Sequence, residues 1–460
     1  MPVAAVLNAE RMRSMEPWAL ALGIELALVY IVCLGDLRAH IYDFWLGVTA
    51  VCALYGLAIW WLLRKRGGST RTVLLCAILF RLTMWHSPAS LSDDIYRYVW
   101  DGRVQLAGIN PYRYAPDDEA LSALRDESFE QINHRHIPTI YPPLAQAFFT
   151  LAASLHQDPA TVKLGLIFID IGLCFLLARF LALRQMDPRR VVLYAWHPLP
   201  LIEIAGSGHI DALGIACMLA ALYALALDRP ALASALLAAA TLAKLIPIIL
   251  LPLFWLYVGQ ASKQDLRSVF NPRSRAALWA FPACVLIGFL PYINIGTELL
   301  SGLLTYVRHW HFNDMAYTVL YQSLSYIDPA IAQHTRWLCS LLFLIALVYA
   351  LRYVDDPLRT AYWSFGAYIL LSPTVHPWYM LWILPFMPFF PSAAWIALST
   401  LVFLAYEILI DYSLSGAWIE KPWVRWAQYA PFFVLLTCTA LTRYIRASRP
   451  QNGRPDGLQI

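Results

Sequence analysis

Two adjacent carboxylates, Asp93 and Asp94, open a polar segment in a chain that is otherwise strongly apolar. In a helix, Asp94 and Arg97 share one face at spacing i, i+3, and Arg97 and Asp101 do so at i, i+4. A carboxylate can accept the proton of an attacking hydroxyl, and a cation can hold a departing phosphate. These residue types therefore fit the transfer of a sugar from a phosphate to a hydroxyl. Ion pairing of Arg97 with these acids on a hydrated surface is the simpler alternative.

Other polar residues could complete such a site. His209 and Asp211 lie in a short turn before an apolar run, where Asp211 could instead cap a helix. Lys244 is a lone cation in an apolar run, and a lysine at bilayer depth is costly unless it is paired or hydrated. It could hold a lipid phosphate as a point charge or extend along the apolar surface toward water. His376 can titrate near neutral pH and lies beside aromatic residues typical of a membrane interface.

No spacing of ligand residues points strongly to a metal site. The eight cysteines include no CxxC pair, so neither a disulfide framework nor a cysteine-bound metal is expected. Asp93 and Asp94 could hold a divalent cation together with a donor phosphate. The sequence assigns no cofactor beyond this alternative, which rests on the adjacency of the two acids alone.

The composition is that of an integral membrane protein. Of the 460 residues, 60% are hydrophobic and only 14% are charged, whereas soluble domains carry about 25% charged residues. The 18 Trp and 25 Tyr fit anchoring at the two membrane interfaces. The net charge of +4 is small and lies in loops, which excludes nucleic acid as an expected partner. We expect the first apolar run to be an uncleaved anchor, because no clear cleavage site follows it.

Charged loops predict the orientation of the chain. The loop Arg64–Arg71 carries four cations and should be cytoplasmic. The span that follows it then delivers residues 89–142 to the extracytoplasmic side. That segment holds nine acidic residues and five arginines, and it is too long for a simple connector. We predict a multi-pass protein of the plasma (inner) membrane, with both termini cytoplasmic and about 11–14 crossings.

The chain divides into segments without a separate soluble domain. The expected segments are N-terminal spans (1–88), the acidic catalytic loop (89–142), core helices (143–295), a second extracytoplasmic loop (296–333), C-terminal spans (334–447) and a disordered tail (448–460). Apolar runs predict spans near residues 18–34, 44–63, 73–85, 164–183, 212–227, 277–293, 336–351, 360–375, 378–390, 393–410 and 428–442.

Two stretches do not fit simple spans. Residues 144–155 are too short to cross a bilayer, so we expect them at the interface, with residues 191–205 returning outward. This path brings the turn at His209 to the face that carries Asp94. The alternative is that residues 144–155 cross and residues 191–205 are interfacial. Residues 231–258 are short for two crossings, which predicts a broken hairpin with Lys244 near its tip.

Several motifs together resemble GT-C glycosyltransferases, over residues 90–390. Those of the acidic loop are similar to the first outer loop of polyprenyl-phosphate-mannose-dependent bacterial mannosyltransferases and of glycosyltransferase family 87, and more distantly to the catalytic subunit of GPI mannosyltransferase I. They are Asp93-Asp94-Ile95-Tyr96, Gly108-Ile109-Asn110-Pro111-Tyr112 and Tyr141-Pro142-Pro143-Leu144. Gly208-His209-x-Asp211, Lys244-x-x-Pro247 and His376-Pro377-Trp378-Tyr379 also look like segments of these enzymes.

The resemblance implies an all-α, polytopic transmembrane bundle with an inverting activity and an extracytoplasmic site. The donor would be a hexose, with mannose as the expected sugar, on a polyprenyl phosphate, and the acceptor a cell-envelope glycolipid or polysaccharide. The family's proposed base lies at the start of the first outer loop; Asp94 matches it best because it precedes Ile-Tyr, with Asp93 as the competitor. The candidate donor-phosphate ligands are Arg97 and Lys244. The candidate contacts for acceptor or sugar are Asp101, Tyr141, His209, Asp211 and His376.

Two other functions compete with this interpretation. A membrane transporter would place ionisable residues along several spans and show related halves, whereas the polar residues here gather mostly at one face. A lipid-linked-glycan ligase or polymerase would use a lipid diphosphate and carry its main polar loop late in the chain. Here the large acidic loop comes early, which favours the transferase.

Overall fold

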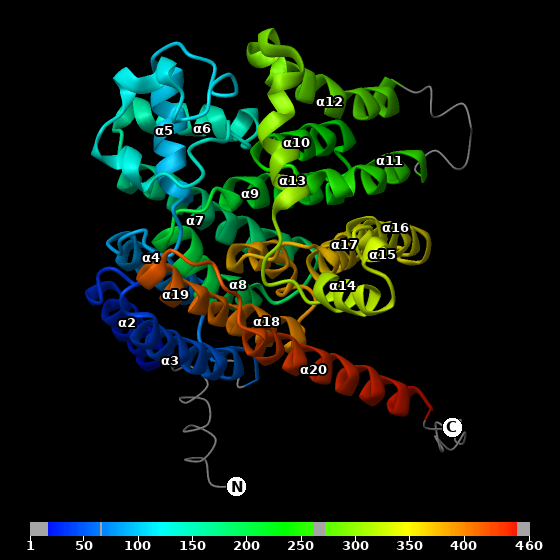
Figure 1. Cartoon of the computed structure of the whole chain (residues 1–460). Helices are drawn as coiled ribbons and strands as arrows, with labels where there is room; N and C mark the ends of the chain where they lie inside the picture. The colour runs from blue at the N-terminus through cyan, green and yellow to red at the C-terminus, as the bar shows by residue number, and fades with distance from the viewer. Residues whose placement is uncertain (1–16, 65–66, 261–271, 449–460) are drawn as a thin grey trace, which may run out of the picture.

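The computed structural model describes residues 17–64, 67–260 and 272–448 (Figure 1). All regular elements in these ranges are helical, and the β-type pairing found there is an isolated bridge between Phe312 and Thr374. The predicted all-α fold is confirmed. The N-terminal 16 residues and the predicted tail after Ser448 lie outside the described ranges.

Five helices in the described ranges are long and apolar enough to cross a membrane, and a bent pair brings the number to six. The chain is thus a polytopic membrane protein, as predicted. The expected 11–14 crossings are not established, because several apolar helices are shorter than the roughly 20 residues of a full span. The five long helices are Ile41–Arg64, Pro159–Leu183, Arg275–His309, Thr335–Tyr353 and Ala393–Ser415. The shorter apolar helices are Trp18–Cys33, Pro143–Leu155, Pro230–Ala243 and Ile246–Tyr257.

The N-terminal helices pack together and lead to the acidic loop. Ser69 starts the third of them by accepting a hydrogen bond from the Thr72 amide, which satisfies a free donor of the first turn. These helices are α2 (Trp18–Cys33), α3 (Ile41–Ile59) with its π-helical end η1 (Trp60–Arg64), and α4 (Thr70–Trp85).

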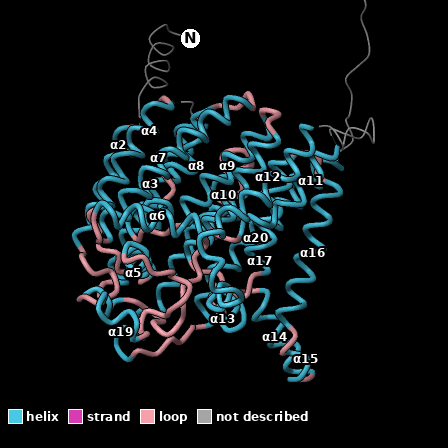
Figure 2. The backbone as a smooth tube through the Cα atoms, turned by 90° about the horizontal axis from the view of Figure 1, so that it is seen from above, coloured by secondary structure: helices cyan, strands magenta, loops and turns pink. Residues whose placement is uncertain are grey.

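The acidic loop folds into short helices. Asp118 and Asp126 cap two of them through their carboxylates. Figure 2 shows this region among loops at one end of the molecule, together with α13 and α19. The elements are α5 (Asp94–Leu106), η2 (Glu119–Leu124), η3 (Glu127–Gln131) and α6 (Pro143–Leu155).

Residues 191–205 do not form the predicted span. They fold into short pieces whose side chains are all buried, and the last piece meets the next helix at a bend of 119°. Pro198 and Pro200 explain the break, because each removes a backbone donor. The elements are α7 (Pro159–Leu183), η4 (Pro188–Val191), α8 (Val192–Ala195), η5 (Pro200–Gly206) and α9 (Asp211–Ala226).

The predicted break at Lys244 is confirmed. The residue has extended backbone angles at the end of α10 (Pro230–Ala243), and a new helical turn follows it. Helix α10 packs between α9 and α12. The following elements are η6 (Ile246–Leu250), α11 (Leu251–Gln260), α12 (Pro272–Phe289) and η8 (Leu290–Leu300).

The span predicted at 378–390 is wrong. Short 3₁₀ turns with prolines at 377 and 385 run there through the protein interior, and their side chains are almost all buried. An apolar run of this length can fill a core as well as cross a bilayer, which the sequence alone does not separate. The C-terminal elements are α13 (Ser301–His309), α14 (Ala316–Ile327), α15 (Pro329–Ala332), α16 (Thr335–Tyr353), α17 (Pro357–Leu371), η9 (Pro377–Trp382), η10 (Leu384–Phe386), α18 (Ala393–Leu401), η11 (Val402–Glu407), α19 (Ile408–Ser415) and α20 (Pro422–Ser448).

Candidate active site

Asp94 is the first residue of α5, and a carboxylate there is favoured by the positive end of the helix dipole. Its side chain is 25% exposed, so it is accessible yet mostly surrounded by protein. Burial raises the pKa of Asp94 to about 6, although the charge of Lys244 and a hydrogen bond from Tyr141 both lower it. Asp94 therefore combines access with a basicity above that of an ordinary aspartate.

Asp93 faces a different neighbour. Its carboxylate forms an ion pair with Arg38, which lies in the turn between α2 and α3. Arg38 also donates a hydrogen bond to the Ser90 carbonyl, so the pair ties the start of the acidic loop to the N-terminal helices. The two adjacent acids thus have separate environments, and of the two, Asp94 lies among the other candidate site residues.

The turn after η5 brings His209 to Asp94. His209 Nδ1 lies 3.9 Å from Asp94 Oδ2, and His209 Nε2 lies 3.4 Å from Glu203 Oε2. Gly208 allows this approach: its φ is +78°, and a Cβ there would lie 2.5 Å from Ile95 Cδ1. A residue with a side chain would be strained at this φ and would have to displace the Ile95 side chain of α5.

Asp211 and Lys244 form a buried ion pair. Lys244 Nζ donates to Asp211 Oδ2 at 2.6 Å, and Trp382 Nε1 donates to the other carboxylate oxygen at 2.6 Å. The Asp211 side chain has no exposed surface, while that of Lys244 is 17% exposed. Two strong hydrogen bonds thus fix the carboxylate, and the carboxylate fixes an ammonium group that still reaches solvent.

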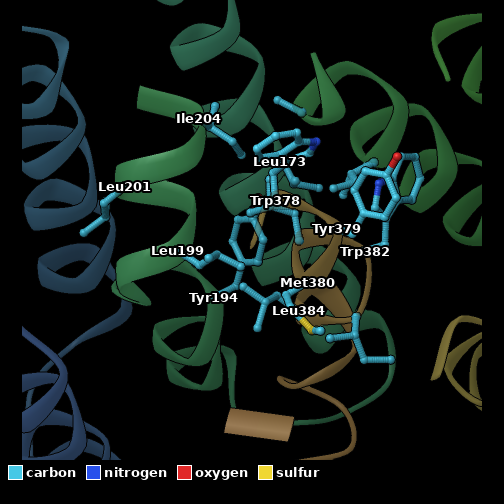
Figure 3. Close-up of a cluster of buried hydrophobic side chains, with 14 of the residues drawn as sticks. Leu173, Tyr194, Leu199, Leu201, Ile204, Trp378, Tyr379, Met380, Trp382 and Leu384 are labelled. Atoms are coloured by element: carbon cyan, nitrogen blue, oxygen red, sulfur yellow. The ribbon is translucent and has the colours of Figure 1, made fainter. Parts of the chain in front are cut away.

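Aromatic rings line the same region. Trp378 stacks on His209 with ring centroids 3.9 Å apart and on His376 with centroids 4.4 Å apart. Lys244 Nζ lies 5.1 Å from the centre of the Tyr379 ring, within cation–π range. Figure 3 shows Trp378, Tyr379 and Trp382 of η9 in one cluster of buried side chains. His376 thus lies in the candidate site, joined to His209 through one indole.

Arg97 and Asp101 lie in a separate buried cluster. Arg97 Nε donates to Asp101 Oδ1 at 2.8 Å, and Arg97 also donates to the Ile137 carbonyl at 3.0 Å. Asp101 Oδ2 accepts hydrogen bonds from Thr139 and from Gln146, the latter at 2.9 Å. These contacts tie the end of the loop to α5. They occupy the guanidinium group predicted to bind the donor phosphate, and they place Asp101 away from the His209 turn.

Tyr141 connects this cluster to the candidate base. Its ring meets Tyr98 edge-on, with centroids 4.9 Å apart, and its backbone carbonyl accepts a hydrogen bond from Tyr112 at 2.7 Å. Its side chain also lies near enough to the Asp94 carboxylate to lower the pKa of that group. The predicted site residues brought together are therefore Asp94, Tyr141, His209, Asp211, Lys244 and His376.

Sequence reasoning missed two polar side chains of this region. Glu203 is completely buried beside His209, and Tyr406 donates a hydrogen bond to it at 2.7 Å. A single acid inside the apolar run at 199–205 was a usable signal for Glu203, because such residues are costly in a membrane. Nothing in the sequence places Tyr406 there. Within the described ranges, no group of three or more His, Cys, Asp or Glu could hold a metal ion.

Comparison with known families supports the interpretation of the motifs. A family model described as alpha-(1->6)-mannopyranosyltransferase, N-terminal domain, matches residues 27–286, which is more than half of the chain. The matched range includes Asp94, His209 and Lys244 and ends before η9. Among curated proteins, no significant match to the chain was found. The resemblance to GT-C mannosyltransferases is thereby confirmed.

Proposed function

Because the chain belongs to the alpha-(1->6)-mannopyranosyltransferase family of GT-C enzymes, we propose that it transfers mannose from a polyprenyl-phosphate donor to a hydroxyl of a cell-envelope glycolipid or polysaccharide. The observation that carries this proposal is that a candidate general base and a cation able to bind a phosphate lie in the same site. Asp94 is an accessible carboxylate of raised pKa, and it interacts electrostatically with the partly exposed ammonium group of Lys244.

The transfer would proceed as one displacement with inversion. The acceptor oxygen forms a bond to C1 of mannose while the bond from C1 to the phosphate oxygen breaks on the opposite face. Asp94 takes the acceptor's proton as that bond forms. Lys244 stabilises the negative charge that grows on the departing polyprenyl phosphate, and Asp211 holds Lys244 in position. The partly exposed His376 ring would contact the sugar, and Trp378, which stacks on both His376 and His209, would hold that ring in place.

The decisive test compares Asp94→Asn with Asp93→Asn. Purified protein in lipid would receive radiolabelled polyprenyl-phosphate mannose and an envelope lipid extract, and transfer to the extract would be measured. Asp94→Asn should lower kcat by about 10²–10⁴-fold, the usual contribution of a general base. Asp93→Asn should have a much smaller effect, because Asp93 pairs with Arg38 at the start of the loop.

The pH profile gives a second readout of the same assignment. The ionised form of Asp94 is the active one, so wild-type activity should fall as pH falls through about 6. Full activity of a folded Asp94→Asn protein would refute the base assignment. A wild-type protein inactive with every polyprenyl-phosphate sugar tested would refute the transferase proposal and direct the work to transport assays.

A further inference from the structure

Three buried polar atoms next to the candidate base form no hydrogen bonds with the described residues. They are Nδ1 and Nε2 of His209 and Oε2 of Glu203, and none of them has a hydrogen-bond partner within the described part of the chain. His209 Nε2 and Glu203 Oε2 are 3.4 Å apart. The His209 side chain is 1% exposed and that of Glu203 is fully buried. Buried polar groups are nearly always paired, so this arrangement calls for a functional account.

The surroundings of Glu203 fix both its position and its charge. Tyr406 of η11 donates a hydrogen bond to Glu203 Oε1 at 2.7 Å, which leaves Oε2 directed at His209. Glu203 lies in the π-helix η5, and the His209 amide donates to the Glu203 carbonyl at 3.0 Å, which ties the turn to this helix. Asp211 is the charged residue that affects Glu203 most, and it is itself negative. An unpaired carboxylate in this position would be very costly, so the neutral acid fits the site.

The tautomer of His209 follows from its two neighbours. A neutral imidazole has one N–H donor and one acceptor nitrogen. Opposite an ionised Asp94, Nδ1 must carry the hydrogen, and Nε2 must then accept one. The described group within reach of Nε2 is Glu203 Oε2, which can donate only when it is protonated. Stacking on Trp378 holds the ring in plane, and a shift of about 1 Å would bring Nδ1 to hydrogen-bonding distance of Asp94.

We propose that Glu203 is a positioning residue that acts as a neutral acid: it donates a hydrogen bond to His209 Nε2 and thereby holds the Nδ1–H of His209 toward the carboxylate of Asp94. Glu203 does not touch the substrate in this arrangement. It acts through His209, which stabilises the ionised form of the base. This inference rests on the proposed role of Asp94 and adds to it a residue from a different element.

The first test is independent of any substrate. Infrared difference spectra between wild type and Glu203→Gln, recorded at neutral pH, should show loss of the carbonyl band of a protonated carboxylic acid. Glu407→Gln is the matched control, because Glu407 is also buried but pairs with Lys421, so its replacement should remove carboxylate bands. Loss of only carboxylate bands in Glu203→Gln would overturn the proposal, whatever sugar or donor the protein uses.

The second test uses the acidic limb of the kcat/KM profile. The amide of Glu203→Gln can still donate to His209 and accept from Tyr406, so this variant should keep the wild-type limb and activity within a few-fold. Glu203→Leu can do neither, and its limb should move to higher pH by about one unit, the effect of losing one hydrogen bond to an ionised carboxylate. The groups that face Asp94 and stay unchanged in both variants are Asp93, Tyr98, Tyr141, Asp211 and Lys244.

The outcomes separate this proposal from the proposed function. The positioning role would be overturned if the acidic limb of the kcat/KM profile did not move in a folded Glu203→Leu protein, or if it moved equally in both variants. Either result would leave Asp94 as the base. Thermal unfolding followed by Trp fluorescence establishes that each variant is folded. If the wild type does not transfer mannose, the proposed function fails, and the infrared result still decides whether Glu203 is a neutral acid.

Discussion

At the scale of single residues, Lys244 links donor binding to the stability of the core. Its ammonium group neutralises Asp211, whose side chain is fully buried. Lys244→Met should raise the KM for the polyprenyl-phosphate donor, because the phosphate loses its cation. It should also lower the free energy of unfolding by about 3–5 kcal/mol, because an unpaired buried carboxylate remains. Donor saturation curves and denaturant unfolding would measure the two effects.

A double variant separates these two effects. Lys244→Met with Asp211→Asn removes both charges, and the asparagine can still accept the hydrogen bond from Trp382. We expect this protein to regain most of the lost stability but not the affinity for the donor. If the double variant regained the wild-type KM for the donor as well as the stability, Lys244 would be a structural residue that does not bind the phosphate.

The sequence singled out most of the residues that the structure gathers around Asp94, but not how they are grouped. Lys244 was recognisable because a charged residue is rare and costly in an apolar run, and Asp94 and His209 because they lie in a polar segment and a short turn beside such runs. The sequence did not reveal that Arg97 donates to both Asp101 and the Ile137 carbonyl, because those contacts depend on how the loop folds back. The contact of Glu203 with Tyr406 spans 203 positions of sequence, a separation at which periodicity carries no information.

At the scale of elements, the contact between α5 and α6 sets the position of Asp94. A Cβ on Gly102 would lie 2.4 Å from the Phe149 carbonyl oxygen and 2.8 Å from Ala153 Cβ, so the two helices touch at this glycine. Gly102→Ala should force α5 away from α6 and displace the candidate base at its N-terminus. Activity should therefore fall, while the free energy of unfolding should change only modestly. The overpacking cost of about 1–3 kcal/mol is partly offset by the better helix propensity of alanine.

Gly172→Ala in α7 is the matched control for this prediction. A Cβ at Gly172 meets nothing within 4 Å, so alanine there should leave activity unchanged and stabilise the helix by up to about 1 kcal/mol. Activity assays and melting temperatures of both variants provide the comparison. Wild-type activity in Gly102→Ala would mean that the position of α5 tolerates movement, and that the loop does not depend on this contact for its geometry.

The same scale shows where prediction of elements succeeded. The helices Trp18–Cys33 and Pro143–Leu155 begin and end within one residue of their predicted bounds, because apolar runs and flanking polar residues mark them. The errors fall at 191–205 and 378–390, where prolines interrupt apolar sequence in the interior. Hydropathy reports that such segments avoid water, but it does not separate burial in protein from burial in lipid.

At the scale of the whole molecule, the arginine-rich loops and the acidic loop carry opposite charge, and these charges predict the orientation. At one end Arg184 pairs with Asp356 at 2.7 Å, and Arg189 donates to the Gly67 carbonyl at 3.3 Å, which gathers the arginine-rich loops. The acidic loop lies at the other end, near α13 and α19 (Figure 2). The excess of arginine predicts that the first end is cytoplasmic.

Cysteine labelling would test this orientation in cells. In a protein with all eight native cysteines replaced, Glu119→Cys in η2 and Asp355→Cys before α17 each introduce one exposed thiol. A membrane-impermeant maleimide should label Glu119→Cys on intact spheroplasts and Asp355→Cys only after permeabilisation. Neither residue is one of the candidate site residues, so activity of the labelled proteins serves as the folding control. The reverse labelling pattern would place Asp94 on the cytoplasmic side and require a donor presented from that leaflet.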